Sequence, residues 1–145
     1  MGMRRKAREA AMQFLFQEDH GVASEFSPAT LAGRFDTFCE LYQVGKKSRG
    51  YALHLIEQTL THQGEIDDYI RAAAKNWRLE RLACTDRNLL RLCVGELLYG
   101  EDVPSQVAIN EAVEIAKRYG SGDSPAFVNG ILDTVQKTIA EKCLS

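Results

Sequence analysis

The stretch MRRKAREAAMQFLFQ, residues 3–17, decides the first helix and much of the fold. Its small and apolar residues recur at the i, i+3, i+4, i+7, i+8 spacing that places them on one side of an α-helix. These residues are Ala7, Ala10, Ala11, Phe14 and Leu15. We therefore predict an amphipathic helix that buries this side.

The opposite side of this predicted helix combines cations with an aromatic ring. At about 100° per residue, four side chains fall along one stripe of the helix: Arg5, Arg8, Met12 and Phe16. An exposed Phe16 suits RNA, because unpaired bases stack on aromatic rings while guanidinium groups hold phosphates. The alternative is that Phe16 packs under the following loop, around Val22 or Phe26, and the spacing leaves both open.

Helical spacing continues through the rest of the chain, interrupted by glycine and proline. Six further helices are predicted, over about residues 28–42, 51–60, 66–77, 86–99, 105–119 and from 124 onward. No stretch alternates convincingly with a period of two. The fold class is therefore all-α: a bundle of about seven helices in one domain of residues 1–145, packed as two helical halves, about 1–83 and 84–145.

Several residues are typical of helix ends. Thr85, Ser105 and Ser124 are predicted N-caps, with Pro125 in the first helical position, and Gly120 is a predicted C′ residue.

Two residues inside predicted helices indicate packing contacts. A mid-helix glycine costs about 1 kcal/mol relative to alanine, so we attribute Gly130 to close helix packing. Trp77 is predicted to lie in the core.

Charge is unevenly distributed along the chain. The net charge of −2 argues against a broadly basic coat for nucleic acid. However, four of the 18 lysines and arginines lie within the first eight residues, which hold no acid. A cationic end on an acidic body indicates a local anionic partner.

Composition excludes several classes of protein and site. The four cysteines form no CxxC pair and no histidine lies at ligand spacing, so we expect reduced, buried thiols in a cytoplasmic protein, without a disulfide framework or metal site. No run reaches 18 apolar residues, and the acids in the first 19 residues disfavour a targeting peptide. No motif indicates a nucleophile or a glycine-rich phosphate loop. We expect no catalytic residues and no cofactor.

Two further segments are candidate anion sites. GKKSRG, residues 45–50, adds Lys46, Lys47 and Arg49. It is either a solvated helix start or an extension of a phosphate-binding surface, depending on whether it lies beside the N-terminus. GSGDSPAF, residues 120–127, places Asp123, Ser124 and Phe127 at a helix start. Helix amides there can bind an anion, although ordinary capping explains the segment equally well.

Four stretches together resemble one family. RRKAREAAMQFLFQ (4–17), DRNLLRL (86–92), DVPSQVAINEAVEIAKRYG (102–120) and DSPAFVNGILD (123–133) occur in this order. The chain resembles the NusB family of bacterial transcription antitermination factors over nearly its whole length. Family members usually carry Tyr at the position of Phe16, a basic residue at that of Ala126 and a larger residue at that of Gly95.

The resemblance implies a non-enzymatic, all-helical protein that binds boxA-type single-stranded RNA together with NusE, a ribosomal protein of the small subunit, and helps assemble an antitermination complex on RNA polymerase. The positions it implies for RNA binding are Arg4, Arg5, Lys6, Arg8, Phe16, Asp123, Ser124 and Phe127. Those it implies for NusE are Glu80, Asp86 and Arg87. The alternatives are a helical protein–protein adaptor without RNA affinity of its own and, less favoured, a methyltransferase-type domain, for which the methyl-donor glycine loop is absent. A homodimer remains open.

Overall fold

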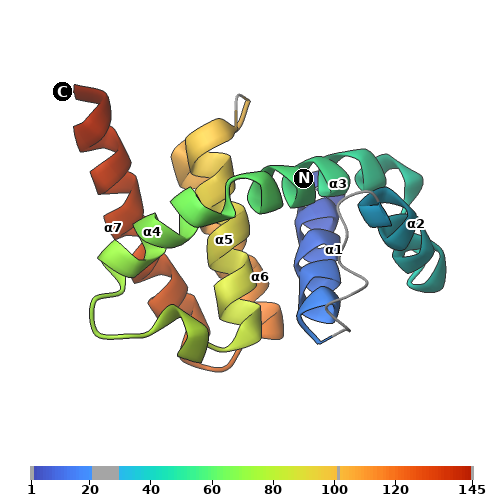
Figure 1. Ribbon diagram of the computed structural model, residues 1–145, viewed down its shortest axis with the longest axis horizontal. Helices are drawn as coiled ribbons and strands as arrows, with labels where there is room; N and C mark the ends of the chain where they lie inside the picture. The colour runs from blue at the N-terminus through green and yellow to red at the C-terminus, as the bar shows by residue number, and fades with distance from the viewer. Residues whose placement is uncertain (1, 21–29, 101, 145) are drawn as a thin grey trace.

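The computed structural model describes residues 2–20, 30–100 and 102–144, and every regular element in these ranges is helical (Figure 1). The elements are α1 (Gly2–Asp19), α2 (Leu31–Leu41), α3 (Lys46–Thr61), α4 (Gln63–Ala73), a short 3-10 turn (Leu79–Arg81), α5 (Cys84–Tyr99), α6 (Ser105–Tyr119) and α7 (Ser124–Leu144). The predicted all-α class and the number of helices are confirmed. None of these helices is both long and apolar enough to cross a bilayer.

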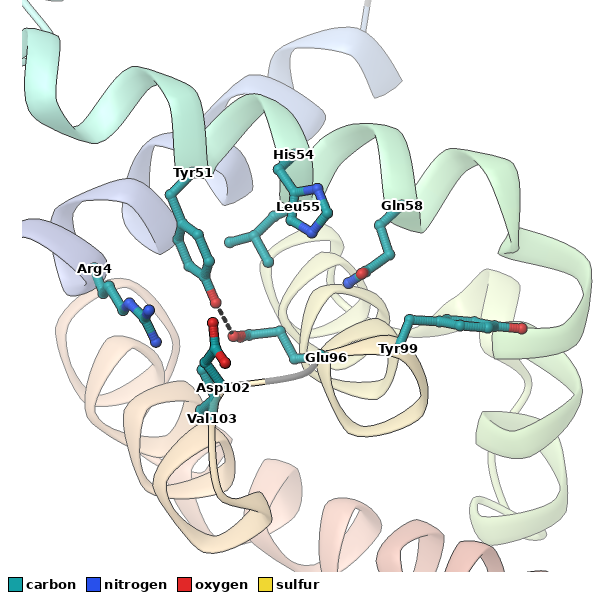
Figure 2. A pocket seen from close by; sticks show the side chains of 10 residues that line it. Arg4, Tyr51, His54, Leu55, Gln58, Glu96, Tyr99, Asp102 and Val103 are labelled. Carbon is teal, nitrogen blue, oxygen red and sulfur yellow. Dashed lines mark hydrogen bonds between the residues drawn. The ribbon is translucent and has the colours of Figure 1, made fainter.

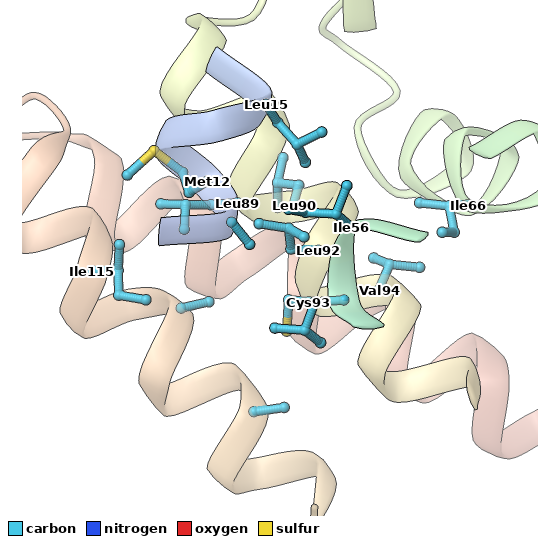
Figure 3. Close-up of a cluster of buried hydrophobic side chains, with 14 of the residues drawn as sticks. Met12, Leu15, Ile56, Ile66, Leu89, Leu90, Leu92, Cys93, Val94 and Ile115 are labelled. Carbon is cyan, nitrogen blue, oxygen red and sulfur yellow. The ribbon is translucent and has the colours of Figure 1, made fainter. Parts of the chain in front are cut away.

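Helix α5 runs through the middle of the bundle and contacts α1, α3, α4, α6 and α7. A helix covered on several sides must be apolar on several sides, and α5 buries consecutive residues from Asn88 to Val94, with the partly exposed Arg91 as the one interruption. Figure 3 shows its side chains between those of the neighbouring helices. The labelled neighbours are Met12, Leu15, Ile56, Ile66 and Ile115.

The predicted buried side of α1 is confirmed, because each of its five residues is at most 5% exposed. The predicted opposite side is only partly right. Phe16 is 40% exposed, which the spacing had left open, whereas Arg8 and Met12 are only 5% and 2% exposed. Helix α1 contacts α6 as well as α3 and α5, so it buries a wider arc than a single apolar stripe indicates. The alternative partners of Phe16, Val22 and Phe26, lie outside the described residues.

Several helix boundaries differ from the predicted ones. Helix α3 begins at Lys46, so most of GKKSRG is its first turn, and Gly64 lies inside the first turn of α4. Helix α4 ends at Ala73, so the prediction that Trp77 lies in the core is wrong: it follows the helix and is 60% exposed. The predicted start of the second helix at Pro28 lies outside the described residues.

Two predicted N-caps are wrong. Thr85 and Ser105 lie within α5 and α6, whose preceding residues, Ala83 and Pro104, provide no side-chain cap. Ser124 is the first residue of α7, and its hydroxyl accepts a hydrogen bond from the Ser121 backbone N–H at 3.0 Å. The Ser124 side chain therefore closes the connection between α6 and α7.

The cysteines are free, as expected, but their burial varies. Cys39 and Cys93 are buried, Cys84 is partly exposed and Cys143 is exposed. Burial raises the pKa of the Cys93 thiol well above its usual range, so this thiol stays protonated as a small core residue. The prediction of buried thiols is therefore right for two cysteines and wrong for Cys143.

Two glycines give opposite predictions for stability. A Cβ at Gly130 would meet no atom within 4 Å, so attributing this residue to close packing is wrong. Gly130→Ala should raise the free energy of unfolding by about 0.5–1 kcal/mol, because alanine favours the helix. At Gly120, whose backbone is extended and not left-handed as a C′ glycine would be, a Cβ would lie 2.5 Å from Ser124 Oγ.

Gly120→Ala should therefore lower the free energy of unfolding by about 1–3 kcal/mol, as overpacking does. Urea denaturation of both variants and of the unsubstituted protein provides the comparison. Destabilisation by Gly130→Ala, or no effect of Gly120→Ala, would contradict the packing described for these two positions.

Candidate nucleic-acid interface

The side chain of Arg8 points into the bundle and pairs with Glu96 of α5. Its Nε and Nη2 donate to the two carboxylate oxygens of Glu96 at 2.8 and 2.9 Å. The Tyr51 hydroxyl of α3 donates to the same carboxylate at 2.6 Å, as Figure 2 shows. Burial and this bond raise the pKa of Tyr51 to about 12, so the phenol keeps its proton. The network joins three helices, because donors from α1 and α3 satisfy a buried carboxylate of α5.

Arg5 forms a second bidentate pair, with Glu111 of α6. Its Nε and Nη2 donate to the two carboxylate oxygens at 2.9 and 2.7 Å. The hydrogen bond and charge of Arg5 lower the pKa of Glu111. Cations at a helix N-terminus oppose the helix dipole, and here acids of the same chain offset them: Glu96 and Glu111. Arg5 and Arg8 are therefore engaged in the fold itself.

The other two N-terminal cations, Arg4 and Lys6, have side chains that lie at the surface. The Arg4 guanidinium lies 5.0 Å from the centre of the Tyr51 ring, a cation–π contact at the surface. Arg4 remains partly exposed and Lys6 is exposed. Figure 2 shows Arg4 at the edge of a cavity of about 340 Å³ between α3 and the end of α5. Of the predicted cations, these two have side chains oriented for an external anion.

The first turn of α3 lies beside the first turn of α1. The Ser48 hydroxyl donates to the Met3 carbonyl oxygen at 3.2 Å. GKKSRG therefore does lie next to the N-terminal cations, which the sequence left open. Arg49 is held by Glu40 at 3.2 Å, while the exposed cations of this turn are Lys46 and Lys47.

Phe16 lies near the end of α1 and forms an aromatic pair with His20. The two ring centroids are 4.5 Å apart with 28° between the planes, and Phe16 remains 40% exposed. The neighbouring Asp19 carboxylate fixes this end of α1 against the start of α5. It accepts hydrogen bonds of 3.1 to 3.4 Å from Cys84, Arg87 and Asn88.

An ion pair brings the end of α6 to the Phe16 side of α1. Arg118 Nη1 lies 3.3 Å from Glu9 Oε2, and the Arg118 side chain is 69% exposed. Glu9 and Phe16 are seven residues apart, so they share one face about 10 Å apart. Arg5 contacts Glu111 further back along α6, so α1 and α6 run in the same direction here. Phe16 therefore lies on the side of Glu9 toward the α6–α7 connection.

The α6–α7 connection carries the second predicted group of residues. Asp123 is exposed, Phe127 is half-buried and Ser124 is only 2% exposed. Ser124 therefore orients the connection and offers no side chain to a ligand. The structure thus places Phe16, Arg118, Asp123 and Phe127 along one end of the bundle. Sequence reasoning missed Arg118, although a basic residue in the last turn before Gly120 was a usable signal.

The three residues predicted to face NusE differ in exposure. Glu80 is exposed on the 3-10 turn, 3.5 Å from Arg71. Asp86 is 8% exposed in the first turn of α5, and its Oδ1 has no hydrogen-bond partner among the described residues. Arg87 pairs with Asp19. Of these three, Glu80 alone presents its side chain openly.

The buried and exposed arginine pairs should differ in their effect on stability. Arg8→Met leaves Glu96 buried without its cation and should lower the free energy of unfolding by about 3–5 kcal/mol. Arg5→Met breaks a pair whose arginine side chain is 39% exposed and should cost at most about 1 kcal/mol. Urea denaturation at neutral pH tests both. If Arg8→Met and Arg5→Met lower the free energy of unfolding equally, the Arg8–Glu96 pair has no special structural role.

Comparisons with known proteins agree with this architecture. A sequence profile of the NusB family matches residues 5–137. The chain is 55% identical over 142 residues to the transcription antitermination protein NusB of Desulfotalea psychrophila, covering 98% of this chain and 100% of that protein. It is 39% identical over 152 residues to the NusB protein of Geobacter sulfurreducens, covering 98% and 99%.

Solved structures of similar fold include NusB of T. maritima, with a TM-score of 0.79 and 38% identity over 92% of this chain and 90% of that one. Another contains the antitermination factors NusB and NusE in complex with dsRNA. It has a TM-score of 0.80 and 28% identity, covering 95% of this chain and 98% of that one.

Proposed function

The chain belongs to the NusB family, and from this we propose that it is a non-enzymatic, RNA-binding transcription antitermination factor. It binds boxA-type single-stranded RNA together with NusE and helps assemble an antitermination complex on RNA polymerase in the cytoplasm. The similar structure that holds NusB, NusE and dsRNA supports RNA and NusE as ligands. The chain's own surface supports RNA with unpaired bases.

The observation that carries this proposal is the exposed Phe16 ring on a rigid helix. The ring is fixed by its stack on His20 and by the Asp19 contacts with α5. An unpaired base can stack on such a ring, whereas a base inside a duplex is already stacked on its neighbours. The guanidinium of Arg118 pairs with Glu9, two turns before Phe16, and its side chain is 69% exposed, so it can also meet a phosphate.

The structure narrows the set of residues that we propose as direct RNA contacts. Phe16 and Phe127 stack bases, Arg4, Lys6 and Arg118 hold phosphates, and Asp123 accepts hydrogen bonds from base amino groups. Arg8 and Ser124 are at most 5% exposed and act by positioning. Arg5 positions α1 through Glu111. For NusE, we propose Glu80 as the contact residue, since its side chain is exposed.

Removing the Phe16 ring should weaken RNA binding. Stacking is worth about 1–3 kcal/mol per base, so Phe16→Ala should raise the dissociation constant for boxA-type single-stranded RNA roughly 5- to 150-fold. Phe16→Tyr keeps the ring and should bind close to the unsubstituted protein. Leu41→Ala, at an apolar residue of α2 that is 70% exposed, is the matched control. Fluorescence anisotropy with labelled RNA measures all four proteins.

Two results would contradict the proposal. If Phe16→Ala binds RNA with unchanged affinity, no base stacks on Phe16. If the unsubstituted protein binds a single strand and a duplex of the same sequence equally tightly, it has no preference for unpaired bases. Binding of NusE with no measurable affinity for any RNA would instead favour the protein–protein adaptor.

The phosphate contacts predict a change in salt dependence. Each cation that neutralises a phosphate of single-stranded RNA adds about 0.7 to the slope of log affinity against log salt concentration. Lys6→Ala and Arg118→Ala should each reduce this slope by about that amount. Lys137→Ala, at an exposed lysine on α7, serves as the control. Slopes unchanged in Lys6→Ala and Arg118→Ala would place the bound RNA elsewhere.

A further inference from the structure

The connection between α4 and α5 exposes an aromatic ring among basic residues. Four consecutive residues, KNWR at 75–78, are all exposed, and the Trp77 side chain is 60% exposed. Large aromatic side chains are usually buried to a high degree, so a ring this exposed indicates a binding site. None of the contacts described so far uses residues 75–78.

Trp77 is held in place although it is exposed. Its ring contacts Phe127 of α7 edge to face, with centroids 5.8 Å apart and 78° between the planes. Its backbone N–H donates to the Ala74 carbonyl at 3.0 Å. Ala74 and Leu79, on either side, are 4% and 3% exposed and anchor the segment in the core. A ring fixed in this way loses little conformational entropy when a ligand stacks on it.

The charge around Trp77 suits a polyanion. Residues 75–81 contain three exposed cations, Lys75, Arg78 and Arg81, against one carboxylate, Glu80. That carboxylate is shared with a further cation, because Arg71 Nη2 lies 3.5 Å from it. An excess of cations next to an exposed aromatic ring is the combination that binds the backbone and bases of single-stranded nucleic acid.

The position of Trp77 links it to the surface already described. Its contact with Phe127 joins it to the start of α7, four residues after Asp123. Figure 1 shows the α4–α5 connection and the α6–α7 connection at the same end of the bundle, where α1 also ends. Phe16, Phe127 and Trp77 therefore lie at one end of the molecule, on three segments that are far apart in the sequence.

We propose that Trp77 is a further base-stacking residue, which extends the path of single-stranded RNA from Phe127 along the α4–α5 connection. Lys75 and Arg78 hold the phosphates on either side of the base that stacks on Trp77. This inference rests on the proposed function and deepens it by adding one nucleotide subsite.

The chain offers a direct probe of this site, because Trp77 is its only tryptophan. Intrinsic fluorescence of the full chain therefore reports on this ring. Titration with boxA-type single-stranded RNA should quench the fluorescence, with the same midpoint as binding measured by anisotropy.

Substitution provides the second measurement. Trp77→Ala should weaken binding of single-stranded RNA roughly 5- to 150-fold, as expected for one lost stacked base, whereas Trp77→Phe should lose less. Lys75→Ala and Arg78→Ala should each lower the salt slope by about 0.7. Tyr42→Ala, at another aromatic residue that is 62% exposed, is the matched control and should bind RNA as the unsubstituted protein does.

The outcomes separate this inference from the proposed function. Weak binding by Phe16→Ala together with unchanged binding by Trp77→Ala and no quenching overturns the Trp77 subsite and leaves the proposed function standing. A fluorescence change with NusE alone, together with loss of NusE affinity in Trp77→Ala, makes the segment a protein-binding surface and also overturns the inference. Absence of any RNA binding by the unsubstituted protein overturns both.

Discussion

The buried pair of Arg8 and Glu96 is the constraint on which the arrangement of α1 depends. A charge that is only 5% exposed is tolerated when it is paired and hydrogen-bonded, and here the carboxylate also accepts the Tyr51 hydroxyl. The pair fixes the rotation of α1 about its axis and the position of α1 along α5 and α3. Phe16, eight residues further and about 80° around that axis, is thereby turned outward.

The candidate interface is assembled from contacts between segments that are distant in sequence. Asp19 holds the end of α1 against α5, Glu9 holds the end of α6 against α1, and Phe127 meets Trp77. Each contact brings one exposed ring or cation to the same end of the bundle. The interface is therefore as rigid as the helix packing beneath it, and its exposed residues need little reorganisation to meet a ligand.

The cationic N-terminus has two roles that charge counting does not separate. Arg5 and Arg8 neutralise acids of α5 and α6 and hold the bundle together, whereas Arg4 and Lys6 remain at the surface. The basic surface available to RNA is accordingly smaller at this end than the four cations indicate. Arg118, Lys75 and Arg78, which stand alone or in short runs in the sequence, are exposed cations elsewhere on the surface.

Helical spacing by itself determined the all-α class and the five buried residues of α1, because spacing encodes the angle of each side chain about its own helix axis. It could not show how much of that helix other elements cover. The partners of Arg8 and Arg5 lie 88 and 106 residues away, and the exposure of Trp77 follows from the end of α4 at Ala73. Only the tertiary structure decided these points, because burial and ion pairing depend on which helices meet.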